Sequence, residues 1–264
     1  MRSITTSETE QIRNQFEQDG FYHARAVFDP AELAELETDF DRIVDQLCRS
    51  NEKINARWQG EQMQEASIAD TEVIHTHNVQ SYSAIWARAL FQPRFLDMAS
   101  AILGPDVVLH HTKLFQKPPE KGAPFPIHQD WTYFPTERDS MIAGIIHVRD
   151  ADDTMGCLRV YPGSHRLGRV ANSHGRRRID VLRQHPLEQA TPIEAKAGDV
   201  VFFHYFTLHG SLPNRSERTR KTVLVQLMNG RDATEGEVKH PDTKLVLRGW
   251  NHRMTRSGNI LPLG

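Results

Sequence analysis

"DVVFFHYFTLHG", residues 199–210, is a short run rich in valine and aromatic side chains that ends in a glycine. Runs of this composition, bounded by Gly, Pro, Asp or Asn, are typical of β-strands. Four similar runs lie between residues 107 and 230, and no helical pattern separates most of them. They are VVLHHTKLFQ (107–116), MIAGIIHVRD (141–150), CLRVYPGS (157–164) and KTVLVQLMNG (221–230). We therefore expect a mainly β protein, an antiparallel sandwich or barrel with flanking helices.

The beginning of the chain shows helical patterns instead. Ser7 and Glu10 fit a capping box, and Gly20 ends the helix that follows. Asp29, followed by a proline and by Glu32, starts a second helix. The apolar residues of this second helix recur at helical spacing: Leu33, Leu36, Phe40, Ile43, Val44 and Leu47.

Residues 81–105 predict one or two more helices, closed by a Gly-Pro pair. A chain of 264 residues could hold one large domain or two small ones, and we expect one domain over residues 1–264. We expect a helical N-terminal part to about residue 105, a β core from about 106 to 230, and a C-terminal extension over 231–264.

Composition narrows the class of protein. Thirty-two Lys and Arg against 34 Asp and Glu leave a net charge of −2, so no overall positive field is available to bind nucleic acid. No apolar run is long enough to span a membrane. The only cysteines, Cys48 and Cys157, are too few for a disulfide scaffold and favour a reducing compartment, the cytoplasm. The oligomeric state stays open, and the 14 histidines point to metal binding.

A polar pair interrupts the apolar stretch PFPIHQDWTYFP, residues 124–135. In an extended strand His128 and Asp130 point to the same side and Gln129 to the other, as two ligands of one metal require. A plain His-Asp hydrogen bond would explain the pair equally well unless a third ligand exists.

His209, at the end of its apolar run, is the best third ligand. His204 sits among aromatic residues and fits a core position, whereas spacing does not exclude His110, His111 or His147. Two histidines and one carboxylate are typical of non-haem Fe(II) oxygenases, which keep coordination positions open. Zinc hydrolases use a similar set.

An arginine lies at the head of the next strand. Arg220 follows His209 by eleven residues, and a guanidinium fork suits bidentate binding of a carboxylate. Spacing alone leaves Arg215, Arg218 and Arg220 open.

Several motifs together resemble the phytanoyl-CoA dioxygenase family of Fe(II)- and 2-oxoglutarate-dependent oxygenases, over roughly residues 12–230. They are FEQDGFYHARAVFDPAELAELE (16–37), KPP (117–119), HQD (128–130), GCLRVYPGSHR (156–166) and AGDVVFFHYFTLHGS (197–211), followed by Arg220. The resemblance implies a double-stranded β-helix, or jelly roll, with flanking helices and Fe(II) at its open end. Met155-Gly156 stands where an Asn-Gly or Gly-Gly pair is usual in the family.

The resemblance also implies roles for residues. His128, Asp130 and His209 match the iron ligands, Arg220 matches the arginine that anchors the distal carboxylate of 2-oxoglutarate, and Ser211 matches a hydroxyl that helps it. Two further residues, Lys113 and Gln116, are candidates for contact with the co-substrate. The implied reaction consumes O2 and releases succinate and CO2 while it hydroxylates or otherwise oxidises an unactivated C–H bond of a small-molecule metabolite. Related halogenases carry a small residue in place of Asp130.

The substrate-binding residues are less constrained. His75 and Asn78 lie in the region from which family members contact substrate, and Trp131 and Tyr133 follow the ligand pair. The six arginines of segment 166–190, together with Arg248 and Trp250, are a candidate lid for an anionic substrate. Solvated loops and a plain aromatic core are the alternatives.

Two other functions compete with this prediction. A non-catalytic jelly roll that binds a ligand or senses a metal is one, although an intact ligand set with Arg220 argues against it. A zinc hydrolase is the other, but it leaves Arg220 unexplained.

Overall fold

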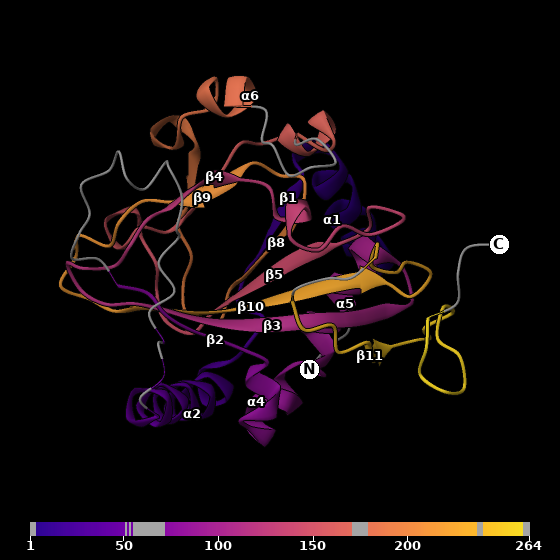
Figure 1. The fold of residues 1–264 in the computed structure, drawn as a ribbon, viewed down its shortest axis with the longest axis horizontal. Helices are drawn as coiled ribbons and strands as arrows, with labels where there is room; N and C mark the ends of the chain where they lie inside the picture. The colour runs from indigo at the N-terminus through magenta and orange to yellow at the C-terminus, as the bar shows by residue number, and fades with distance from the viewer. Residues whose placement is uncertain are drawn as a thin grey trace.

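Two antiparallel β-sheets form the centre of the structure (Figure 1). The computed structural model describes residues 4–50, 52, 54, 72–170, 179–236 and 240–260. The large sheet has the order β1-β8-β5-β10-β3-β11, with β2 also paired to β3, and the small sheet has the order β4-β9-β6-β7. This arrangement confirms the predicted mainly β, jelly-roll fold.

The strands of the large sheet are β1 (Phe21–Ala24), β2 (Ile74–His77), β3 (Val107–Lys117), β5 (Ile142–His147), β8 (Val200–His204), β10 (Arg220–Asn229) and β11 (Leu245–Arg248). Those of the small sheet are β4 (Phe125–His128), β6 (Leu158–Val160), β7 (Thr191–Ile193) and β9 (His209–Ser211). Of these, β1, β2, β4, β7 and β11 lie outside the five runs that the sequence analysis identified.

Helices cover the outer face of the large sheet (Figure 1). They are α1 (Thr6–Asp19), α2 (Pro30–Arg49), α4 (Ala84–Ala89) and α5 (Pro93–Leu103), and a further short helix, α6 (Ile179–Arg183), lies beside the small sheet. Residues 81–105 thus form two helices after a short 3-10 turn, as expected. None of the described helices combines the length and the apolar character needed to cross a membrane.

The helix ends follow from local hydrogen bonding, with one correction. Helix α1 is capped by Thr5, whose side chain accepts from the amide of Glu8 while the Glu8 carboxylate accepts from the amide of Thr5. The predicted Ser7–Glu10 box was wrong, because the same Ser/Thr-x-x-Glu spacing occurs twice in overlap and Ser7 lies inside the helix. The box of Asp29 with Glu32 at the start of α2 is confirmed.

The run at residues 199–210 forms two strands, not one. Strand β8 pairs with β1 and β5 in the large sheet, whereas β9 pairs with β4 and β6 in the small sheet. Between them the chain turns at residues 205–208, where the amide of Thr207 donates to the carbonyl of His204 over 2.8 Å. The prediction of one strand over residues 199–210 was therefore wrong: the turn carries His209 from one sheet to the other.

Alternation along β10 separates the core from the interior cavity. Val223, Val225 and Leu227 are buried in the apolar cluster that the helices share with the large sheet. Residues of the opposite face of the strand line a cavity between the sheets: Arg220, Thr222, Leu224 and Gln226. One face of the strand therefore packs under the helices, and the other supplies polar groups to the cavity.

Candidate active site

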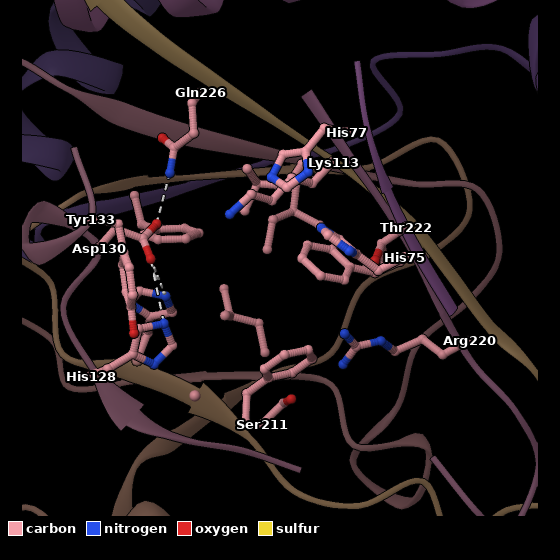
Figure 2. Close-up of a pocket in the computed structure, with 18 of the residues that line it drawn as sticks. His75, His77, Lys113, His128, Asp130, Tyr133, Ser211, Arg220, Thr222 and Gln226 are labelled. Carbon is pink, nitrogen blue, oxygen red and sulfur yellow. Dashed lines mark hydrogen bonds and ion pairs between the residues drawn. The ribbon is translucent and has the colours of Figure 1, made fainter. Parts of the chain in front are cut away.

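Strands β4 and β9 bring the predicted ligands together. His128 and His209 are direct partners in the register of these two strands. Asp130 Oδ1 lies 3.4 Å from His128 Nε2 and 3.5 Å from His209 Nε2. All three side chains are buried, and one donor atom from each lies within 4.8 Å of the others, as a shared metal ion requires. Figure 2 shows His128 and Asp130 together on one wall of the cavity.

Hydrogen bonds orient each of these donors. The Nδ1 atoms of His128 and His209 lie 2.8 and 2.9 Å from the carbonyl oxygens of Pro126 and Thr207, so each ring can donate there and leave Nε2 free of a proton. This is the usual support of a metal-bound imidazole. Asp130 Oδ2 accepts from Gln226 Nε2 at 2.8 Å, which leaves Oδ1 between the two rings. The chemistry of the donor set therefore fits a divalent iron with open positions.

The electrostatics of Asp130 agree with this role. Burial alone would raise the pKa of Asp130, but His209 and His128 hold it well below its usual range. The carboxylate is therefore ionised at neutral pH, as a metal ligand must be.

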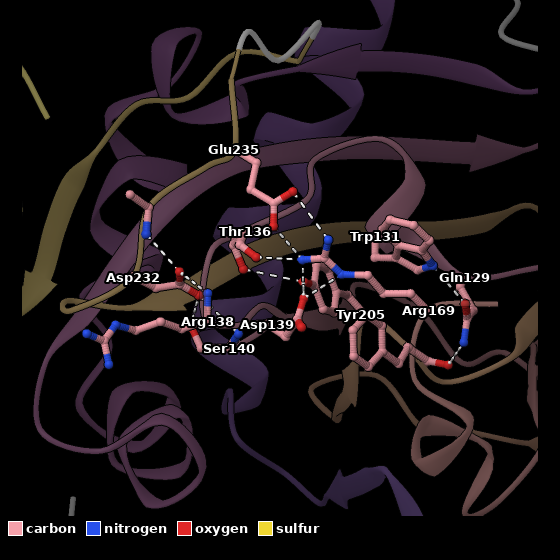
Figure 3. A network of polar contacts seen from close by, with 12 residues as sticks. Gln129, Trp131, Thr136, Arg138, Asp139, Ser140, Arg169, Tyr205, Asp232 and Glu235 are labelled. Carbon is pink, nitrogen blue, oxygen red and sulfur yellow. Dashed lines mark hydrogen bonds and ion pairs between the residues drawn. The ribbon is translucent and has the colours of Figure 1, made fainter. Parts of the chain in front are cut away.

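Gln129 fixes the segment between the ligands. Only His128 belongs to β4, and Asp130 opens a 3-10 turn, so the predicted continuous strand was wrong. Gln129 itself is extended, with φ −118° and ψ 143°, so the ligands still share a side. Its amide group donates to the carbonyls of Phe206 and Gly168 at 2.6 and 2.9 Å (Figure 3).

Trp131 supports this segment and does not line the cavity. Its indole Nε1 donates to Gln129 Oε1 at 2.8 Å, and the guanidinium of Arg169 lies 5.0 Å from the ring centroid. Arg169 in turn pairs with Asp139 and Glu235, each at 2.6 Å (Figure 3).

The other described residues that were predicted to form a lid do not line the cavity either. Arg166 donates to the carbonyl of Gln18, Arg248 pairs with Asp97 at 2.9 Å, and Trp250 is 67% exposed. None of these three lines the cavity. The arginines at positions 176–178 lie outside the described residues.

Arg220 faces the ligand set from the far side of the cavity (Figure 2). Its guanidinium is buried and donates to the carbonyl of Gly156, yet Nε has no hydrogen-bond partner and no carboxylate of the described residues pairs with it. Burial lowers its pKa to about 10. Arg218, by contrast, pairs with Asp152, and Arg215 is exposed. Of the three arginines that spacing left open, Arg220 is the one in the cavity.

Gly156, whose carbonyl accepts from Arg220, has a backbone conformation that favours glycine. Its φ is 64°, and a Cβ atom there would meet the carbonyl oxygen of Leu212 at 2.0 Å. The preceding Met155 is buried, and its φ is not positive, so its backbone conformation does not require glycine. The departure from the family pattern at Met155-Gly156 therefore keeps the residue that the geometry needs.

Lys117 is a neighbour of this end of the cavity that the sequence analysis missed. Its buried Nζ donates to Ser211 Oγ at 2.6 Å and to the carbonyl of Leu212 at 2.9 Å. Burial and Arg220 lower the pKa of Lys117 well below its usual range. Lys113, on the same face of β3, and Ser211 line the cavity, whereas Gln116 does not.

The cavity has a volume of about 550 Å³, the size of a small-molecule site. His75 and Tyr133 line it as expected, but Asn78 does not. Four polar residues of the wall were not assigned to a site from the sequence: His77, Thr222, Gln226 and His240. His147, left open as a ligand, lines the cavity too, whereas His204 bonds to the carbonyl of Asp139 and lies outside it.

Replacing Gln226 with leucine should weaken metal binding at this site. The change removes the amide that orients Asp130, and loss of such a partner typically costs about 10- to 100-fold in affinity. Binding of Mn2+, which prefers sites with carboxylate ligands, can be followed by its electron paramagnetic resonance. Gln116→Leu, on the neighbouring strand and outside the cavity, is the matched control and should bind normally. Equal affinity in both variants would mean that Gln226 does not position a ligand.

Comparison with known proteins agrees with this geometry. The profile of the Phytanoyl-CoA dioxygenase (PhyH) family matches residues 16–222. The peroxisomal phytanoyl-CoA dioxygenase of Bos taurus is 27% identical over 80% of this chain and 66% of its own length. A probable alpha-ketoglutarate-dependent hypophosphite dioxygenase of Stutzerimonas stutzeri is 31% identical over 50% of this chain and 49% of its own. The chain thus spans about two thirds and one half of these relatives.

A solved structure shows the same fold. The epimerase SnoN, in complex with Fe3+, alpha ketoglutarate and nogalamycin RO, superposes with a TM-score of 0.74 at 20% identity, over 92% of this chain and 100% of SnoN. Because the family profile covers most of the chain, the protein belongs to the phytanoyl-CoA dioxygenase family of Fe(II)- and 2-oxoglutarate-dependent oxygenases.

Proposed function

We propose that this protein oxidises an unactivated C–H bond of a small anionic metabolite, with His128, Asp130 and His209 as iron ligands and Arg220 as the anchor of 2-oxoglutarate. The observation that carries the proposal is a buried guanidinium without a carboxylate partner among the described residues, across a cavity from a His-Asp-His set. Bound iron supplies the activation of O2 that couples oxidation of the substrate to conversion of 2-oxoglutarate into succinate and CO2.

The ligand residues prepare the metal site before any substrate enters. His128, Asp130 and His209 would hold the metal from one wall of the cavity and would leave the cavity itself to the co-substrate and substrate. Hydrogen bonds from the two rings and from Gln226 hold the donors in place. Little rearrangement is then needed on binding, which favours both affinity and a fixed direction of attack.

Arg220 and Ser211 would receive the distal carboxylate of 2-oxoglutarate. A buried cation without a counter-charge is costly, and a dicarboxylate that enters the cavity relieves that cost. The guanidinium is held by the carbonyl of Gly156, and the hydroxyl of Ser211 by the amine of Lys117. Both groups are therefore fixed before the co-substrate arrives.

The charge of the cavity supports an anionic substrate. Lys113 lines it close to the metal ligands and has no ion pair with any described residue. Burial lowers the pKa of Lys113, whereas Asp130 raises it. Among the described residues that line the cavity Asp130 is the one acid, so a second anionic group would have Lys113 as its partner. The hypophosphite dioxygenase among the relatives is named for an anion.

We also place this activity in the cytoplasm. Both cysteines are free thiols, and Cys48 is exposed, a state that fits a reducing compartment.

Arg220→Ala should weaken binding of 2-oxoglutarate. Loss of one partner of a buried charge pair costs about 2–5 kcal/mol, which corresponds to at least about 30-fold weaker binding. Calorimetric titration of the Mn2+-loaded protein with 2-oxoglutarate measures this. Arg218→Ala, which removes an exposed arginine of the same turn, should bind like the wild type. A similar small loss in both variants would contradict the assignment of Arg220.

Only anions should stimulate turnover when metabolites are screened for 2-oxoglutarate consumption. With the best compound, Lys113→Met should raise KM about 10-fold or more, because a charge-assisted hydrogen bond is lost. Lys121→Met, at an exposed position, serves as the control. A neutral or cationic compound as the best substrate, or an unchanged KM in Lys113→Met, would refute the anionic class.

A further inference from the structure

A second group of histidines lies beside the same cavity, and two of its three members line it. His77 of β2, His111 of β3 and His240 of the loop before β11 each place one ring nitrogen within 4.8 Å of the others. His77 Nε2 and His240 Nδ1 are 3.2 Å apart. Two imidazole nitrogens on one tetrahedral metal, with bonds of about 2.05 Å, are separated by about 3.4 Å. The spacing of this pair therefore already suits a shared ion.

The third ring, that of His111, has a nitrogen without a hydrogen-bond partner among the described residues. His111 is fully buried, and its Nε2 has no hydrogen-bond partner in the described part of the chain. Its Nδ1 lies 2.5 Å from Nδ1 of His110, so a proton on that side would leave Nε2 with a free lone pair. An imidazole whose far nitrogen is hydrogen-bonded and whose near nitrogen is bare is the usual state of a metal ligand.

The backbone brings the three rings together from distant parts of the sequence. His77 is the register partner of Lys113 on β3, so β2 lies directly beside the strand that carries His111. The loop with His240 is attached to β3 through Thr243, whose amide donates to the carbonyl of His110 at 2.7 Å and whose hydroxyl donates to that of Leu109 at 2.9 Å. The group is thus anchored on one strand of the large sheet.

We propose that His77, His111 and His240 form a second metal site, which binds a divalent transition metal such as Zn2+ with a fourth position open to the cavity. Three imidazoles suit zinc, copper and nickel better than they suit magnesium or calcium. Because His77 and His240 line the cavity, an ion there would meet a bound anion. Burial lowers the pKa of His77 and of His240 to about 4, so both rings are neutral at pH 7.

The surroundings separate this site from the iron ligands. The ring of Tyr133 neighbours both groups, with its centroid 5.9 Å from that of His240 and 6.5 Å from that of His128. The two sites share no ligand, so each can be removed without the other. The test of the second site therefore does not depend on the proposed oxygenase activity.

Zn2+ stoichiometry of the metal-free full-length protein tests the proposal. Equilibrium dialysis should give two equivalents for the wild type, one for His128→Ala/Asp130→Ala and one for His240→Ala. Combining all three substitutions should leave none. Replacing Zn2+ with Co2+ in His128→Ala/Asp130→Ala should give the visible absorption of a four- or five-coordinate ion, and this absorption should vanish when His240→Ala is added.

Matched variants keep the outcome decisive. His240 is only partly buried, so its replacement should leave thermal unfolding unchanged, and His77→Ala offers a second removal of a ligand. His252→Ala removes a histidine that pairs with Asp106 outside the group, and this variant should keep both equivalents. A single equivalent in the wild type, or a second equivalent that survives both His240→Ala and His77→Ala, would overturn the proposal.

Discussion

The pairing of β4 with β9 is the constraint on which the site depends. It places His128 opposite His209, at the edge where the small sheet meets the cavity. This pairing exists because the chain leaves the large sheet at the end of β8, His204, and enters the small sheet five residues later, at His209. The large sheet contributes Gln226, whose side-chain amide donates a hydrogen bond to Asp130. The proposed ligand set is thus fixed by contacts from both sheets.

The second constraint is buried charge. Arg220 and Lys113 face the cavity, and neither pairs with a carboxylate of the described residues. Burial of a charge without a partner costs several kcal/mol, so such groups are retained where a ligand supplies the missing charge. The apolar face of β10, packed under the helices, stabilises the strand that carries Arg220 at one end and Gln226 near the other. One face of β10 therefore packs against the helices, and its opposite face lines the cavity.

Local patterns account for what could be predicted from the sequence. Alternation in an extended segment was enough to put His128 and Asp130 on one side, and β-rich runs between turn residues were enough to predict the sheets. The boundaries between sheets were not predictable in this way, because the break after β8 interrupts an apolar run without a glycine or proline. Two overlapping Thr/Ser-x-x-Glu spacings likewise gave no reason to choose Thr5 over Ser7.

Residues contributed by long-range pairing were missed for a different reason. His77, Lys117 and His240 reach the cavity or its wall only because β2, β3 and the loop before β11 lie side by side, and no local pattern records that. Arg220 could not be chosen over Arg218 from the sequence, because the direction in which the chain leaves the turn decides which arginine reaches the cavity.

Anaerobic visible absorption measures whether iron and 2-oxoglutarate bind together at the His128, Asp130 and His209 set. Wild-type protein mixed with Fe(II) and 2-oxoglutarate should develop the weak metal-to-ligand band of a chelated oxoacid. The band should require both additions and should be absent from His209→Ala protein that is folded normally. A folded wild-type protein that gives no band, or a His209→Ala variant that gives the same band, would contradict the account.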